Sequence, residues 1–134
     1  MTIPRNLGEI GTFATTTGGM QNNIFTTCRS IGLQETQVVV SAANIDLSTA
    51  NYFTRTVAAN ITFTVSNIPS SGTAASFILD LTNGGAFTIT WFGGVKWAGG
   101  TAPTLTAAGR DALGFYTYDS GSTWTGLVLG KDIK

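Results

Sequence analysis

The chain has 134 residues and a formal net charge of zero, with seven basic residues, seven acidic residues and no histidine. This length suits one domain, and the thinly scattered charges exclude the basic surface that nucleic acid or an anionic membrane requires. Charged residues make up only 10% of the chain, against roughly 25% in a typical soluble domain. Uncharged Thr, Ser, Asn and Gly must cover much of the surface, which favours contact with other proteins because few charges lose their hydration there.

The apolar runs are shorter than the roughly 20 residues that span a bilayer. Residues 1–10 also lack the basic-then-apolar order of a secretory signal. We therefore expect a protein made in the cytosol, with neither a membrane nor a nucleic acid as partner. The single cysteine, Cys28, excludes an intrachain disulfide, and without histidine to activate it an inert thiol is expected.

Residues 1–34 differ in texture from the rest of the chain. Their apolar residues, among them Ile3, Leu7, Ile10 and Phe13, stand alone between glycines and threonines. Such a segment cannot bury these side chains locally. We predict an extended N-terminal arm over residues 1–34 whose four apolar anchors bind a partner protein; the alternative is an edge strand of the body.

Residues 35–134 read as one domain of successive strands separated by turn signals. The first clear pair is 52–57 with 61–65, in which apolar and polar residues alternate as in half-buried strands. A turn near Asn60 separates the two segments, so we predict a hairpin.

Residues 75–82 predict a longer strand, with Asp80 on the face opposite its apolar residues. Asn83 and Gly84 follow it, and Asn-Gly between alternating segments is the usual signal of a type I′ hairpin. The predicted return strand is 86–91. The residues expected to point inward are Phe77, Leu79, Leu81, Phe87, Ile89 and Trp91.

A glycine-rich loop is expected over 92–103, holding one short strand at 95–97. Residues 111–119 and 124–129 then predict a second hairpin closed by a turn at 120–122. Because no long helix is needed, the whole pattern predicts an all-β fold. Two amphipathic sheets must bury their faces against each other, so we expect an antiparallel β-sandwich of jelly-roll type.

Tyr116 and Tyr118 are out of phase with the inward residues Leu113 and Phe115. They are therefore expected on the outer face of the second hairpin. Exposed tyrosine is common at protein interfaces, so we predict that both bind a partner.

The sequence contains few of the residue patterns on which enzymatic catalysis usually depends. Without histidine there is no Ser-His-Asp or Cys-His arrangement and no zinc site of the usual kind. The glycine clusters lack the spacing of a phosphate-binding loop. We predict no metal, no cofactor and no catalytic residue; a sugar-cleaving enzyme would need two of the scattered carboxylates to face each other across a cleft.

The three tryptophans allow a different function. Together with Tyr116 and Tyr118, they could form a platform on which a sugar ring stacks; the three are Trp91, Trp97 and Trp124. Strand alternation places Trp91 and Trp124 more naturally in the core, since Trp91 is in phase with Phe87 and Ile89.

Two stretches carry a family resemblance. They are AASFILDLTNGGAFTITW at 74–91 and GGVKWAGGTAPTLTAAGRDALGFYTYDSGSTWTGLVLGKD at 93–132. Both resemble a domain that recurs in tailed-bacteriophage structural proteins, including tail-fibre and capsid decoration proteins. The resemblance implies a virion component without catalytic activity, and residues 1–34 fall outside it.

Among virion proteins we expect a capsid decoration (cement) protein on the outer capsid surface, because the chain is short and shows no period of a coiled-coil or β-helical shaft. Its partners would be the major capsid protein, held by the N-terminal arm, and other copies of itself. The low charge and the outward Tyr116 and Tyr118 predict a homotrimer. The alternative is a tail-fibre or receptor-binding tip that recognises a host surface glycan. The residues weighed for that glycan site are Trp97, Asn83, Asp119 and Arg110.

Overall fold

The structure is a computed structural model that describes residues 34–134. The predicted anchors Ile3, Leu7, Ile10 and Phe13 lie outside the described residues, and so does Cys28. The interpretation of residues 1–34 as an arm therefore stays a prediction.

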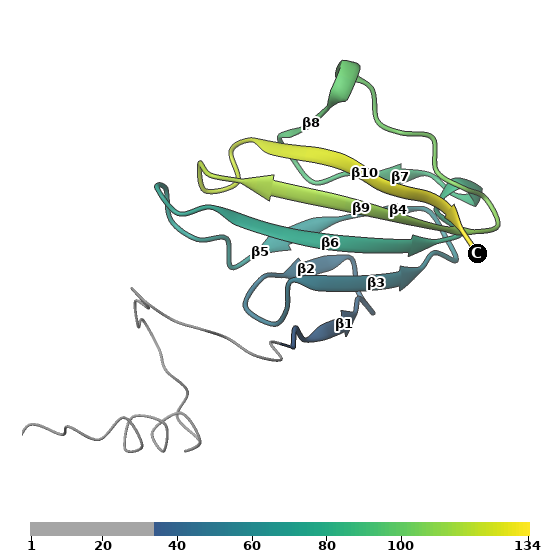
Figure 1. Cartoon of the computed structure of the whole chain (residues 1–134), viewed down its shortest axis with the longest axis horizontal. Coiled ribbons are helices and arrows are strands. Elements are labelled where there is room, and N and C mark those ends of the chain that lie inside the picture. The colour runs from purple at the N-terminus through teal and green to yellow at the C-terminus, as the bar shows by residue number, and fades with distance from the viewer. Residues whose placement is uncertain (1–33) are drawn as a thin grey trace, which may run out of the picture. The chain divides into compact units, whose positions relative to one another are not determined.

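The described residues confirm the all-β class, because strands and two short 3-10 turns make up their regular structure. Six of these strands form one sheet in the order β1-β3-β6-β9-β10-β8 (Figure 1). They are β1 (Gln37–Val39), β3 (Tyr52–Thr56), β6 (Ala75–Thr82), β9 (Arg110–Thr117), β10 (Trp124–Ile133) and β8 (Val95–Trp97).

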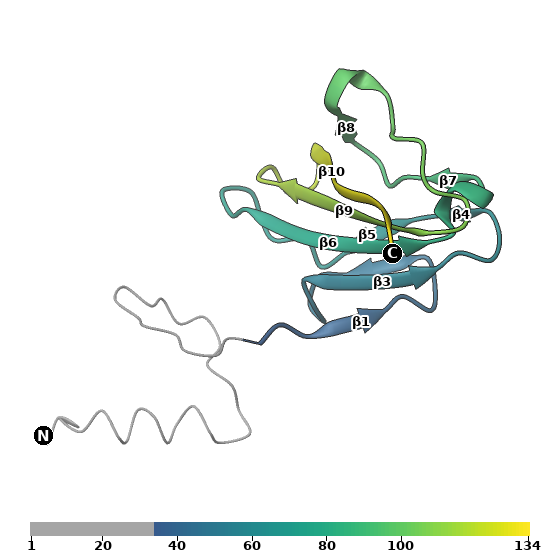
Figure 2. The same cartoon turned by 45° about the vertical axis from the view of Figure 1, so that its right-hand side comes forward.

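Four shorter strands form a second layer behind this sheet (Figure 1). β2 (Asn44–Asp46) pairs with β5 (Thr64–Ser66), and β4 (Ile61–Thr62) pairs with β7 (Ile89–Thr90). The 3-10 turns are η1 (Gly84–Ala86) and η2 (Ala98–Gly100). Figure 2 shows that β8 and the η2 loop rise away from the plane of the large sheet.

Parallel pairing dominates, which is the main difference from the expected architecture. Within residues 34–134 five strand pairs are parallel, and only β6 with β9 and β9 with β10 are antiparallel. The chain crosses from the large sheet to the second layer after β1, β3 and β6. The first two returns place β3 beside β1 and β6 beside β3 in parallel, and the third adds β8, which later pairs in parallel with β10. This order aligns Val38, Phe53 and Leu79 across the sheet. A jelly roll is built from antiparallel strands, so the wholly antiparallel prediction is wrong.

The first predicted hairpin, 52–57 with 61–65, is also wrong. Its two segments form strands, but β3 pairs with β1 and β6 in the large sheet. In the second layer β4 pairs with β7 and β5 pairs with β2. The alternation was informative about burial: Phe53, Val57 and Phe63 are all buried. Alternation reports which face is buried, and it does not report which strand is the neighbour.

The predicted hairpin at Asn83-Gly84 does not form either. Asn83 has the left-handed backbone that the turn needs, with φ 61° and ψ 24°. A type I′ turn needs positive φ at both central residues, and Gly84 instead begins η1 and is buried. Its backbone lies against Leu105, whose Cδ1 is 2.8 Å from where a Cβ of Gly84 would be. The chain therefore turns into the second layer, where β7 pairs with β4.

The hairpin of β9 and β10 is confirmed. Thr125 lies opposite Tyr116 and Gly126 opposite Phe115, and the register shifts after Val128 and again after Gly130. β9 also pairs with β6 along all of its eight residues, so β9 is a central strand.

The core lies between the two layers and is rich in aromatic rings. Phe77 is at its centre, with ring centroids at 5.1 Å from Phe115, 5.5 Å from Trp124 and 5.8 Å from Phe53. Phe77 is stacked on Phe115 and meets Phe53 and Trp124 edge to face, and such aromatic pairs add to the hydrophobic gain from burial. Buried residues from both layers complete the core: Val40, Ile45, Val57, Ile61, Phe63, Leu79, Leu81, Phe92 and Leu113.

The predicted inward residues of the 86–91 segment need correction. Phe87 is 36% exposed, and Ile89 and Trp91 are only partly buried against the core. Trp124 is 1% exposed, so its core assignment is confirmed. Only two residues of the segment, Ile89–Thr90, form a strand, and this short pairing leaves Phe87 without a covering layer.

Candidate interaction surface

One face of the large sheet packs on the core and the other faces away from it. Along β9, Leu113 and Phe115 are buried in the core, and the residues between and beyond them, Gly114 and Tyr116, point to the opposite side. Ile78 on β6 lies directly opposite Gly114. We call this side the outer face.

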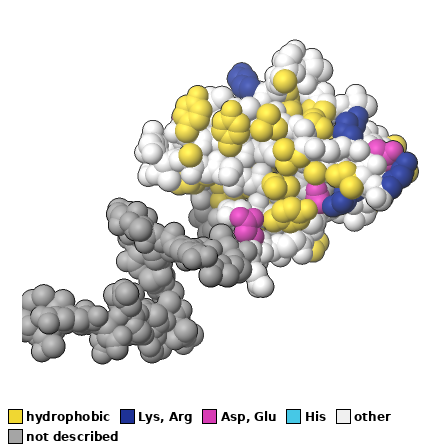
Figure 3. All heavy atoms as spheres, viewed as in Figure 1, with side chains coloured by type: hydrophobic (Ala, Val, Ile, Leu, Met, Phe, Trp, Pro, Cys, Tyr) yellow, Lys and Arg dark blue, Asp and Glu magenta, His cyan; other side chains and the backbone are white. Residues whose placement is uncertain are grey.

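The outer face exposes large apolar side chains, which Figure 3 shows as yellow side chains spread across the sheet. Leu127 is 44% exposed, Leu129 is 54% exposed and Tyr116 is 40% exposed. At the sheet edge, Val39 on β1 is 67% exposed. Contiguous apolar surface of a few hundred Å² on a folded domain is a typical mark of an interaction site.

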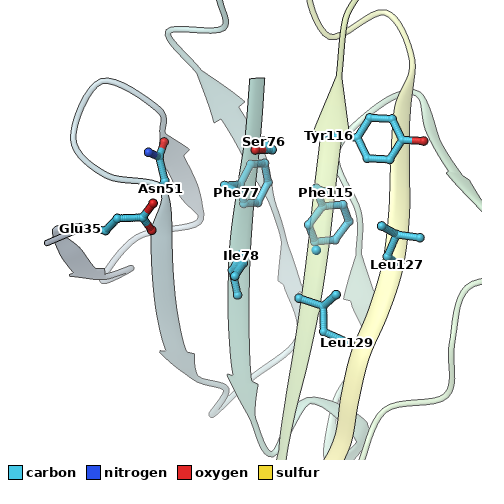
Figure 4. Close-up of a pocket in the computed structure, with 10 residues that line it drawn as sticks. Glu35, Asn51, Ser76, Phe77, Ile78, Phe115, Tyr116, Leu127 and Leu129 are labelled. Carbon is cyan, nitrogen blue, oxygen red and sulfur yellow. The ribbon is translucent and has the colours of Figure 1, made fainter. Parts of the chain in front are cut away.

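A shallow groove of about 310 Å³ runs across the outer face, with Gly114 in its floor. Gly114 has no side chain, so Leu129 can lie over β9: a Cβ at this position would be 3.3 Å from Leu129 Cδ1. Figure 4 shows Leu129 over β9, with Leu127 and Tyr116 beside it on β10 and β9. The apolar side of the groove is therefore formed by β9 and β10.

The other end of the groove is polar. Glu35 and Asn51 line it on the β1 and β3 side, and Ser76 lies near the start of β6 (Figure 4). An apolar floor with a few polar groups at one end suits a partner's side chains, because the polar groups can fix orientation while the apolar area provides the affinity.

Three hydrogen-bonded side chains, Tyr52, Asp80 and Arg110, lie on the outer face beyond the groove. Asp80 is 4% exposed, and its Oδ2 accepts hydrogen bonds from the Tyr52 hydroxyl at 2.6 Å and from Arg110 Nη1 at 2.7 Å. The hydrogen bond to Asp80 raises the pKa of the Tyr52 hydroxyl above its usual value of 10.0, and burial adds to the effect. Arg110 compensates the carboxylate charge, which is otherwise costly to bury.

Replacing Tyr52 with phenylalanine should therefore destabilise the protein at neutral pH by about 1–2 kcal/mol, since a hydrogen bond to a charged group is lost. A raised pKa means that the stabilisation is fully present below pH 10 and is lost as pH rises through the folded-state pKa. The difference in urea unfolding free energy between wild type and Tyr52→Phe should stay constant from pH 7 to about pH 9 and shrink as pH rises above 10. Tyr118→Phe, at a ring 67% exposed, is the control, and an equal effect from it would contradict this assignment.

A second buried carboxylate, Asp111, anchors the loop before β9. It is fully buried and accepts hydrogen bonds from the Thr106 hydroxyl at 2.7 Å and from the backbone N–H of Asp132 at 2.9 Å. The backbone N–H of Thr106 donates a third. Burial opposes the charge, but these donors outweigh it and hold the pKa of Asp111 below its usual value of 3.8. Every bond serves the fold, so Asp111 has a structural role.

The four residues weighed for a glycan site do not converge. Asn83 donates its backbone N–H to Gly109 beside the start of β9, where Arg110 is engaged by Asp80. Asp119 follows the other end of β9, roughly 25–30 Å away along an extended strand. Trp97 packs on Gly126, and a Cβ there would be 2.6 Å from the indole ring. Trp91 and Trp97 meet at 61°, so they do not form one flat platform.

Other kinds of site were sought in the part of the chain that the structure describes. Residues 34–134 contain no group of three His, Cys, Asp or Glu side chains placed to hold a metal ion. Over the same residues, no helix has the length and apolar character needed to cross a bilayer.

The structure places Tyr116 and Tyr118 on the exposed side of the second hairpin, as predicted. Sequence reasoning missed Leu127, Leu129 and Ile78. Counting alternate residues from the buried Trp124 puts 127 and 129 outside, and a glycine between Leu113 and Phe115 is a known sign of close approach across a strand. Both signals were present in the sequence.

Comparisons with protein-family models, curated proteins and solved structures find no match to this chain.

Proposed function

We propose that this chain is a structural protein of a tailed-phage virion, acting as a decoration (cement) protein on the outer capsid shell. The observation that carries the proposal is the apolar outer face of a β-rich body, exposed on a chain with only 10% charged residues. A surface of this kind serves contact between proteins. The stretches at 74–91 and 93–132 resemble tailed-phage structural proteins. In a virion, a surface of this kind would contact neighbouring subunits.

In this proposal the two parts of the chain have different roles. Residues 1–34 attach the protein to the major capsid protein through the isolated apolar residues Ile3, Leu7, Ile10 and Phe13. The body remains on the shell surface. Many weak attachments on a symmetric lattice stabilise the shell together, because each copy that binds favours the assembled state.

The test uses phage particles that lack this protein, mixed with purified full-length chain. Wild type should bind the heads in a fixed ratio, visible by electron microscopy of labelled protein, and should raise the temperature at which the heads release DNA. A variant with Ile3, Leu7, Ile10 and Phe13 changed to serine should lose at least about tenfold in binding, since four apolar anchors are removed. The matched control changes Thr15, Thr16 and Thr17 to serine.

Two results would contradict the proposal. Label confined to the tail would favour the receptor-binding alternative, which host glycan arrays would then test. Normal head binding by the four-serine variant would show that the body carries the attachment surface, and the role given to residues 1–34 would be wrong.

A further inference from the structure

We infer that the outer face binds a second copy of this chain, face to face about a two-fold axis. The inference concerns self-association in solution, and it does not depend on the virion assignment.

The apolar groups on the outer face are arranged so that they can pack against themselves. Leu127, Leu129 and Tyr116 stand above the sheet beside the groove at Gly114. In a two-fold arrangement, a projecting leucine of each copy meets the groove of the other, since the same patch is used on both sides. Leu129 of the same copy covers Gly114, so the partner's leucine would pack beside Leu129 rather than on Gly114 itself.

The size of the face fits a stable pair. The strands β1, β3, β6, β9 and β10 lie side by side at about 4.8 Å spacing, which gives a width of about 20 Å. β6 and β9 have eight residues each, or about 26 Å at roughly 3.3 Å per residue. The flat area is about 500 Å², and side chains raise the accessible area toward the ~800 Å² per partner of a standard interface.

The charges on the face are compatible with a second copy. Glu35 lies with Ser76 at the end of the face where β6 begins, and Arg110 lies opposite Thr82, where β6 ends. A two-fold axis that lies between the two faces, at right angles to the line joining these ends, brings Glu35 of one copy toward Arg110 of the other. The chain as a whole has zero net charge, so long-range repulsion between copies is absent.

A two-fold pair is favoured over the homotrimer expected from the sequence. Three copies around an axis need two different complementary surfaces on each copy, whereas a two-fold pair needs one surface that complements itself. Leu127 and Leu129 lie beside the groove on the outer face, and a two-fold pair can use this same face on both copies.

Neighbouring residues on β10 provide the test. Leu127 and Val128 are each 44% exposed, but Leu127 lies opposite Gly114 on the outer face, and Val128 lies opposite the buried Leu113 and so has the other orientation. Sedimentation equilibrium of the full-length chain from about 1 to about 100 μM should show a monomer–dimer equilibrium. A dissociation constant in this range is at the weak end of the affinities found for an interface of this size. Leu127→Glu should raise the dissociation constant about a hundredfold, since two carboxylates would be buried. Val128→Glu should leave it within about threefold.

The unfolding midpoint of each variant shows whether its fold is intact, and Leu127→Ser replaces Leu127→Glu if the latter lowers the midpoint. A wild-type monomer at the highest concentration overturns the inference, and so does a trimer. Dissociation by both glutamate variants, or by neither, also overturns it, because the contact would then lie elsewhere.

Discussion

Replacing Trp124 with alanine is expected to lower the free energy of unfolding by about 3–5 kcal/mol, as for other buried large aromatic residues. Trp124 is 1% exposed and packs edge-on against Phe77 at 5.5 Å and Phe92 at 5.4 Å. Removing the indole leaves a cavity among rings that close packing holds in place, so the surroundings can collapse only partly.

Trp91→Ala is the matched comparison. Trp91 stacks on Phe63 at 6.0 Å but is only partly buried, so its loss should cost about 1–3 kcal/mol, less than the cost expected from its sequence position as a core residue. Urea unfolding followed by circular dichroism measures both. Equal losses from the two variants would show that the core extends over Trp91, contrary to its exposure.

Asp111→Ala should have the second large effect, about 3 kcal/mol or more. The side chain is fully buried, and its loss would leave the hydroxyl and N–H of Thr106 and the N–H of Asp132 without an acceptor. Buried donors without partners are costly. Because the carboxylate joins the loop before β9 to the end of β10, this variant should also increase hydrogen exchange in both segments.

Asp111→Asn separates charge from shape, because the amide keeps one acceptor oxygen. The pKa of Asp111 is lowered in the folded protein, against the effect of burial, by its hydrogen bonds. Its contribution to stability is therefore present above pH 3.8 and is lost as pH falls through the folded-state pKa. The unfolding free energies of wild type and Asp111→Asn should differ at pH 7 and converge toward pH 2.

Asp132→Asn is the control for this series. The Asp132 side chain makes an exposed ion pair with Lys134 at 2.9 Å, and solvent screening leaves such pairs with little effect on stability. A loss as large as that of Asp111→Asn would show that the acid sensitivity arises at the chain end rather than at the buried carboxylate.

Local sequence determined the strand faces where strands are long. In β6 and β9 the residues Phe77, Leu79, Leu113 and Phe115 are buried as their alternation predicts, and Tyr116 is exposed. The reason is that side chains in a strand alternate strictly between two sides, so apolar periodicity is recorded in the chain itself. The turn at 120–122 between β9 and β10 was likewise a local feature.

Apart from the hairpin of β9 and β10, which strands are neighbours was decided by the tertiary structure. Asn83 has the backbone of a hairpin turn, but Gly84 is held against Leu105, and the chain crosses to the second layer. The groove at Gly114 depends on Leu129, which reaches it through the irregular register of β10 after Val128. Contacts between residues distant in sequence determine these features, and no periodicity within one segment records them, because hydrogen bonding between strands is the same whichever partner supplies it.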